Sequence, residues 1–513
     1  MRKLCILVIL CQLFIAKAQA QNQLEMIELS GLFNDADLII HDDSYANTFV
    51  DEGNLYISEV LHLPKRLKNN TLNKILILAD SSLYSSCEYR IRRYAYDIYY
   101  VYGCEIIMKV IKGETCVDVK NLILNDSTNL DGAVFIGDIA SASYEADDAI
   151  NHYYHTSWLC DMYFMDLDAI WNDYDHDLTF DNYNDDFHPE VFVGRICTKK
   201  VGNGSNEINS FNKYMDKNHY FWIGHRHINK EFALSYTDLS WKSSNDIVNG
   251  IKELYGISKY EHITANNSVF CANDYLERLQ NDKYEFVQLA SHSREWRHEF
   301  DSLVLMPGTN TYDTLSVYIT SSKIYTNGTN AIGMNLFCCS ACRWIYDGYL
   351  GGNYVYSPNS SVLSLVGSTK VGSMLSMSSF YTPLHSGKTM GQALVDWWNS
   401  DTYFQTSVDS TLCWFFGLTI IGDPLVNFFH CTNSTCQNQL TLTSYNTTYS
   451  PLSYYLTSEK ITVSPPSSGS FSIPVGDHCI LNSPIVEIYG AFNCPQGATL
   501  EILSEGCQDN CDD

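Results

Sequence analysis

Short apolar runs separated by helix-length segments recur along most of this chain and constrain its fold more than any other feature. The runs lie at 75–78, 105–110, 133–136, 191–193, 232–234, 286–290, 331–337, 362–366 and 417–421. Helices are expected at 88–101, 206–221, 245–254, 271–279 and 387–398. Strands that are buried on both faces of a parallel sheet have this pattern. The sequence therefore predicts an α/β fold, with a parallel-dominated sheet and helices on both faces.

The composition changes after about residue 430, where Ser, Thr and Tyr become frequent and apolar runs become short. Strands are expected at 460–463, 485–489 and 499–503, and no strict internal repeat is evident. We interpret 430–513 as a small β-rich C-terminal module. Four cysteines are available to staple it, namely Cys479, Cys494, Cys507 and Cys511.

The N-terminus has the features of a secretory signal peptide. Arg2 and Lys3 precede an apolar run over 4–15, and Ala18 and Ala20 form a small-x-small cleavage site. The signal peptide is expected over 1–20, followed by an N-terminal segment or pro-region over 21–70. A secreted, extracellular or cell-surface protein is therefore expected. No later stretch has 18 consecutive apolar residues, so no integral membrane span is expected.

The chain is strongly acidic, with 32 Lys and Arg against 59 Asp and Glu, a formal net charge of −27. This balance argues against nucleic acid as a partner, because binding of its phosphates needs a basic surface. The acids are densest over 161–190 and include Asp173, Asp175, Asp177 and Asp181. Alternating Asp oxygens on a tight loop suit calcium, although Leu178 at the sixth position disfavours an EF-hand. The alternative is a solvated acidic loop.

Two possible catalytic residue types follow predicted strands. His292 comes after the run 286–290, and Cys338, Cys339 and Cys342 come after the run 331–337. Active sites of open α/β sheets lie beyond the carboxyl ends of the strands. If the two strands are neighbours, a histidine can activate a cysteine nucleophile there. The alternatives are a surface histidine and cysteines that are buried, disulfide-bonded or, less favoured, bound to zinc.

Seven short pieces of the chain occur in the order found in one peptidase family. They are Val134–Asp138, Cys160–Tyr163, Glu190–Arg195, Ser291–Trp296, Phe337–Cys339, Ser364–Thr369 and Gly422–Pro424. Through them, residues 71–429 resemble the catalytic domain of the gingipain-type family of caspase-like cysteine peptidases. The resemblance implies a caspase-like fold and peptide-bond hydrolysis, with calcium as a structural ion.

The resemblance also assigns roles to individual residues. It implies that His292 is the catalytic histidine and Cys339 the nucleophile, with the backbone N–H groups of Ser293 and Cys339 as the oxyanion hole. Asp238 is the candidate for orienting the histidine, and a loop cap is its alternative role. Two features depart from the family. Ser293 replaces a glycine, and no acid near Trp241 matches the family's determinant of specificity for basic side chains.

Two functions follow. The first is a secreted cysteine endopeptidase acting on proteins or peptides through a Cys–His pair and a thioester intermediate. The second is a catalytically inactive surface or binding protein that retains the peptidase scaffold. The redox state of Cys339 discriminates between them, because a disulfide to Cys338 or Cys342 would block the nucleophile.

Overall fold

The computed structural model describes residues 55–65, 72–148, 154–184, 187–202, 207–224, 231–264, 268–305, 312–400, 414–429, 437–446, 452–464 and 469–507. The expected signal peptide over 1–20 lies outside these residues, as does most of the segment 21–70. Among the described helices, none has both the length and the apolar character needed to cross a membrane.

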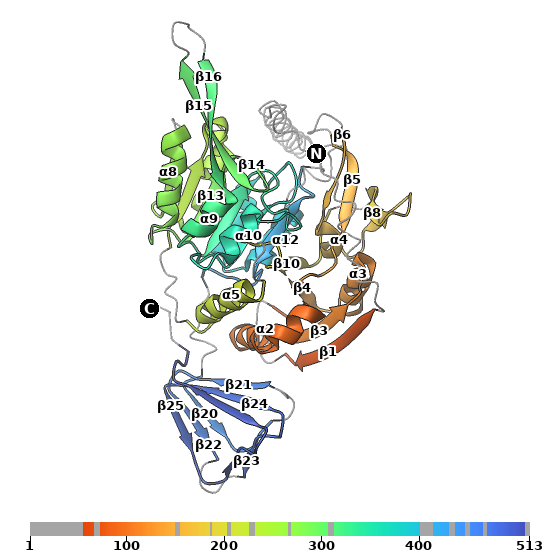
Figure 1. The fold of residues 1–513 in the computed structure, drawn as a ribbon, viewed down its shortest axis with the longest axis vertical. Helices are drawn as coiled ribbons and strands as arrows, with labels where there is room; N and C mark the ends of the chain where they lie inside the picture. Colours follow the sequence, from red (N-terminus) through yellow and green to blue (C-terminus); the bar gives the residue numbers. More distant parts are fainter. Residues whose placement is uncertain are drawn as a thin grey trace, which may run out of the picture.

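A large, mostly parallel sheet forms the centre of the molecule and confirms the mixed α/β class (Figure 1). Its strands are β1 (Tyr56–Leu63), β2 (Lys74–Asp80), β3 (Glu105–Lys112), β4 (Leu130–Ile136), β10 (Phe192–Ile196), β11 (Ala233–Thr237), β12 (Tyr260–Thr264), β13 (Phe286–Ala290), β17 (Gly333–Phe337), β18 (Ser364–Ser368) and β19 (Leu418–Gly422). Their order is β1-β3-β2-β4-β10-β19-β18-β17-β13-β11-β12. The edge strand β1 pairs antiparallel with β3, and β18 pairs antiparallel with β19. The sheet thus takes in residues 56–63, which belong to the segment assigned to a possible pro-region.

Two series of contacting helices accompany the sheet. One contains α2 (Ser81–Tyr102), α5 (Glu207–Trp222), α10 (Leu350–Tyr356) and α9 (Ser321–Asn327), and the other contains α12 (Met390–Ser400), α11 (Met377–His385) and α7 (Lys252–Tyr255). Local sequence fixes the ends of α2. The side chain of Asp80 accepts hydrogen bonds from the N–H groups of Ser82 and Leu83, and Gly103 ends the helix with φ 59°.

Residues from several of the seven short pieces singled out in the sequence meet in the core of the sheet. The Arg195 guanidinium binds the Asp161 carboxylate at 2.7 Å, and both side chains are almost completely buried. The hydroxyl of Thr419 on β19 donates to the same carboxylate at 2.6 Å. Gly194 leaves room for Pro424, whose ring lies 2.6 Å from where a Cβ would be. The order of these pieces in the chain therefore reflects residues that support one another.

A three-stranded antiparallel sheet projects from the central sheet (Figure 1). It contains β14 (His292–Arg294), β15 (Arg297–Leu305) and β16 (Tyr312–Thr320). Its base packs inward through Phe300 and Ile319, which are buried. The sequence analysis did not anticipate these strands, because charged residues interrupt their apolar pattern.

The C-terminal module is a short solenoid of parallel strands. Its strands are β20 (Gln439–Leu442), β21 (Leu452–Leu456), β22 (Lys460–Val463), β23 (Phe471–Ser472), β24 (His478–Asn482), β25 (Ile485–Ile488), β26 (Phe492–Asn493) and β27 (Thr499–Leu503). The strands pair in parallel with partners 21 to 26 residues away in the chain, so the chain winds in coils with three sides. The predicted strands at 460–463 and 499–503 are confirmed.

Inward-facing side chains fill the solenoid, and the last coil differs from the one before it. Val463 and Leu481 are fully buried, with 0% exposure, whereas their partners in the last coil, Ile488 and Ile502, are 37% and 51% exposed. Cys479 and Cys494 are reduced thiols, so the expected stapling does not join these two residues. Cys507 is disulfide-bonded, and its partner is not among the described residues.

The module packs against helices of the main domain. The hydroxyl of Tyr100 on α2 donates to the carbonyl of Tyr454 on β21 at 2.7 Å, and the ring of Tyr89 stacks on His478. Beneath this contact, the buried His219 on α5 binds Asp97 on α2 at 2.9 Å. The α2–α5 face is therefore covered by the module.

The buried Arg195–Asp161 pair provides a test of the core. In R195M the Asp161 carboxylate keeps its burial but loses its cation, so we expect the free energy of unfolding in urea to fall by about 3–5 kcal/mol. The variant R195M/D161L removes both charges and should recover most of this loss. A loss below about 1 kcal/mol in R195M would show that the pair does not support the sheet.

Candidate active site

Three predicted site residues follow three neighbouring strands. β11, β13 and β17 pair in parallel, with Thr237 opposite Ala290 and Ala290 opposite Phe337. Asp238 follows Thr237 directly, and its N–H donates to the Ala290 carbonyl at 2.7 Å. His292 and Cys339 each lie two residues beyond the second register pair. The sheet therefore brings Asp238, His292 and Cys339 to one edge.

The alternation of side chains separates the adjacent cysteines. The ladder ends at Ala290 and Phe337, and continued alternation past that pair would group Cys339 with His292 and Cys338 with Ser291. Cys338 contacts the hydroxyls of Ser291 and Ser293, and burial raises the pKa of its thiol well above the usual range. Cys338, Cys339 and Cys342 are all reduced, so no disulfide blocks Cys339.

Aromatic rings pack around His292. The turn η3 (Leu239–Trp241) places the ring of Trp241 5.4 Å from the imidazole and 5.0 Å from Phe337. Trp241 and Trp344 are buried, whereas Trp296 is 36% exposed. Among these three tryptophans, Trp296 is therefore the one with substantial exposure to solvent.

Asp238 is held by the backbone of two other elements. One carboxylate oxygen accepts the N–H of Ser240 and the other accepts the N–H of Asp301 on β15, each at 3.0 Å. Burial raises the pKa of this carboxyl, while these hydrogen bonds and the charge of His292 lower it. Asp238 thus caps η3, as in its alternative role, and also lies within electrostatic reach of His292.

Ser293 connects the two halves of the site. Its hydroxyl donates to the carbonyl of Cys339 at 2.5 Å. Arg294 and Arg297 close a two-residue turn, so Ser293 and His298 form the next, non-hydrogen-bonded pair of the β14–β15 ladder. The N–H of Ser293 is consequently directed away from β15. Such an orientation suits an oxyanion-hole donor, and it survives the replacement of glycine by serine.

We call residues 291–296 the His loop and 338–344 the Cys loop. Glu295 of the His loop binds Arg343 of the Cys loop at 3.0 Å. The first turn of α10 contacts both loops, because the N–H of Leu350 donates to the Glu295 carbonyl and the N–H of Gly351 donates to the Ala341 carbonyl. Several contacts therefore fix the loops relative to each other.

A buried chain of polar groups lies behind the His loop, and the sequence analysis missed it. The hydroxyl of Tyr275 contacts that of Tyr354 at 3.0 Å, and Tyr354 contacts Nε2 of His298 at 3.0 Å. The other ring nitrogen of His298 lies 3.4 Å from the Ser291 hydroxyl. Burial lowers the pKa of His298 to about 3, so this histidine is neutral at physiological pH.

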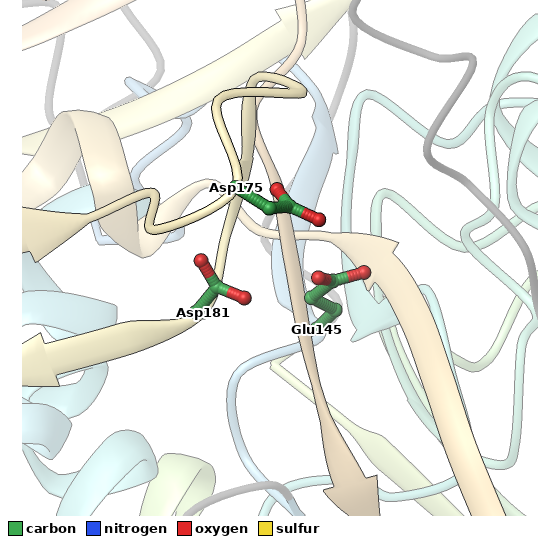
Figure 2. Close-up of side chains that lie close together, drawn as sticks. All are labelled: Glu145, Asp175 and Asp181. Carbon is green, nitrogen blue, oxygen red and sulfur yellow. The ribbon is translucent and has the colours of Figure 1, made fainter.

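The acidic loop divides between two overlapping groups of carboxylates. Asp173, Asp175 and Asp177 form one group, and Asp175, Asp181 and Glu145 form the other, with oxygens within 4.8 Å of one another (Figure 2). Glu145 lies on β5 (Ser143–Asp148), far from the loop in sequence, and no local pattern indicated it. Burial raises the pKa of the Glu145 carboxyl, His155 lowers it, and the charge of Asp177 and a hydrogen bond to Asp181 raise it further.

The oxygens of the loop carboxylates are partly occupied by the chain itself. Asp173 accepts the N–H groups of His176, Asp177 and Leu178, and Asp181 accepts the N–H of Tyr174. These hydrogen bonds shape the turn, in which His176 and Leu178 have positive φ. Asp175, which belongs to both groups, is the best placed of the predicted ligands.

Comparison with protein-family models and with curated proteins finds no match to this chain.

The electrostatic contact between Asp238 and His292 can be measured directly. We expect H292A to raise the pKa of the Asp238 carboxyl, because the imidazole charge that lowers it is removed. D301N should shift it the opposite way, because the Asp301 charge raises it. Carbon-detected NMR titration of labelled aspartate reports both shifts. An unchanged pKa in H292A would place His292 beyond the reach of Asp238.

Proposed function

We propose that this protein is a secreted cysteine endopeptidase with a caspase-like catalytic domain, and that it hydrolyses peptide bonds in proteins or peptides. One observation carries the proposal. β13 and β17 are parallel neighbours in register, and His292 and Cys339 each follow two residues after the last register pair. A histidine beside a reduced cysteine at the carboxyl edge of such a sheet is suited to nucleophilic catalysis.

The proposed reaction begins when His292 takes the proton of the Cys339 thiol. The thiolate sulfur attacks the peptide carbonyl carbon, and the backbone N–H groups of Ser293 and Cys339 stabilise the negative oxygen that forms. His292 then gives its proton to the leaving amine, and the C–N bond breaks to leave a thioester. Water, deprotonated by His292, hydrolyses the thioester and releases the second product.

The turn after Cys339 supports its role over that of its neighbours. Ser340 has a positive φ of 55°, a conformation that non-glycine residues rarely adopt, and its N–H donates to the Lys370 carbonyl at 2.8 Å. Backbone strain of this kind is concentrated at functional sites. Cys342 is packed against Gly351 and Gly367, and burial raises the pKa of its thiol. Cys339 is thus the most plausible nucleophile of the three.

We further propose that calcium binds the carboxylates around Asp175. Hard carboxylate oxygens are the ligands that calcium prefers. Glu145 lies on β5, apart from the loop that carries Asp175 and Asp181, and one ion would join the two segments. The ion would supply structure rather than chemistry, because this loop provides no residue to the Cys–His pair. It would also relieve the repulsion among like charges.

Alkylation tests the nucleophile. Full-length protein is treated with iodoacetamide at mildly acidic pH and digested for peptide mass spectrometry. We expect Cys339 to react while Cys338 and Cys342 stay unlabelled, because only an activated cysteine is a thiolate at this pH. H292A should slow labelling of Cys339 by about tenfold or more. C339A should abolish cleavage of a peptide library.

An unreactive Cys339 with no dependence on His292 would contradict the peptidase. That result would favour the second function, an inactive surface or binding protein that retains the scaffold.

Thermal denaturation tests the calcium site. We expect added calcium to raise the melting temperature of the native protein, because the ion binds the folded loop and not the unfolded chain. D175N removes one ligand from both groups and should abolish most of this increase. D168N, which changes the separate group Asp166, Asp168 and Glu190, is the matched control. An equal increase in native protein and D175N would exclude the proposed ligands.

A further inference from the structure

We propose that the Glu295–Arg343 ion pair holds His292 and Cys339 at the separation that catalysis needs. Glu295 and Arg343 are thus positioning residues of the active site. This inference depends on the proposed peptidase function, which makes His292 and Cys339 the catalytic pair. Neither Glu295 nor Arg343 contacts the reacting atoms in the proposed mechanism. Each acts through the loop that carries it.

The sheet alone does not determine the distance between the two catalytic side chains. β13 ends at Ala290 and β17 ends at Phe337, so His292 and Cys339 both lie past the last register pair. Beyond that point the chains diverge, one into the β14–β15 turn and the other into the Cys loop. Catalytic groups must be held within about 0.5 Å of their productive geometry. Contacts between the loops therefore have to fix the distance between His292 and Cys339, because the strand ladder no longer does so.

Glu295 contacts the Cys loop through its side chain and α10 through its backbone carbonyl. Its carboxylate binds Arg343. Glu295 lies three residues after His292, and Arg343 lies four residues after Cys339. The carbonyl of Glu295 accepts the N–H of Leu350. The hydrogen bond from Ser293 to the Cys339 carbonyl joins the two loops closer to the ends of the strands. The two loops are thus joined by the strand ladder before His292 and Cys339 and by the ion pair after them.

Burial makes the pair rigid enough for this role. The side chain of Glu295 is 8% exposed and that of Arg343 is 15% exposed. An ion pair at this depth is weakly screened by water and salt, unlike the exposed pairs elsewhere on the molecule. Loss of one partner leaves a largely buried charge without compensation, which favours movement of its loop toward solvent.

The test measures alkylation of Cys339 in the full-length protein, in the native background and in H292A. We expect R343M to slow alkylation at mildly acidic pH by about tenfold, since small displacements of catalytic groups have effects of this size. In H292A the same change should alter the rate by less than about twofold, because the imidazole that the pair positions is absent. R343K, which keeps the charge, should be intermediate.

A matched control separates positioning from stability. Lys109 and Asp126 form a pair of similar burial, with 14% and 16% exposure, on β3 and beyond α3 (Cys116–Asn125). K109M should leave alkylation of Cys339 unchanged. Equal slowing by R343M in both backgrounds would overturn the proposal, as would no slowing in the native one. E295Q, which keeps the shape of Glu295, replaces R343M if that variant does not fold.

Amide hydrogen exchange judges the pair independently of the nucleophile. In R343M and E295Q we expect residues 292–296 and 339–343 to lose protection together, while K109M leaves both segments protected. If Cys339 of the native protein shows no dependence on His292, the proposed function fails and exchange alone decides. Joint loss of protection would then support the pair as the link between the loops, and unchanged protection would overturn it.

Discussion

The parallel pairing of β11, β13 and β17 is the constraint on which the candidate site depends. A shift of one residue between β13 and β17 would move Cys339 to the opposite face and bring Cys338 toward His292. The burial of all three strands makes such a shift costly, because every apolar side chain would change its surroundings. The register therefore matters for chemistry as well as for structure, because it sets which of two adjacent cysteines is level with the histidine.

Much of what resembles a peptidase in this sequence serves the scaffold. Arg195 and Asp161 neutralise each other in the core, and the rings of Phe135 and Trp344 lie against the guanidinium. Trp344 belongs to the Cys loop, so the buried pair also supports the segment that follows Cys339. Asp423 accepts hydrogen bonds from Tyr94, Asn218 and Trp222, and its burial raises the pKa of its carboxyl. These residues explain the order of the pieces without themselves indicating activity.

The sequence predicted the features that depend on short-range pattern and missed those that depend on distant contacts. The strand 286–290 has the predicted bounds because five buried residues precede a polar strand end. The β14–β16 sheet was not predicted, because charged residues alternate with apolar ones in its sequence and its strands pair only in the folded chain. The solenoid was not predicted, because the length of its coils varies from 21 to 26 residues and the coils share no sequence motif. Glu145 joins the acidic loop through pairing of β5, which no spacing along the chain reveals.

The open last coil of the C-terminal solenoid has an evolutionary consequence. Each coil contacts only its neighbours, so its stability is set locally. Duplication of a stretch of 21 to 26 residues would add one turn and cover Ile488 and Ile502, while the contact of β21 with α2 stayed in place. The length of this part can therefore change by whole turns under selection, without any adjustment in the main domain.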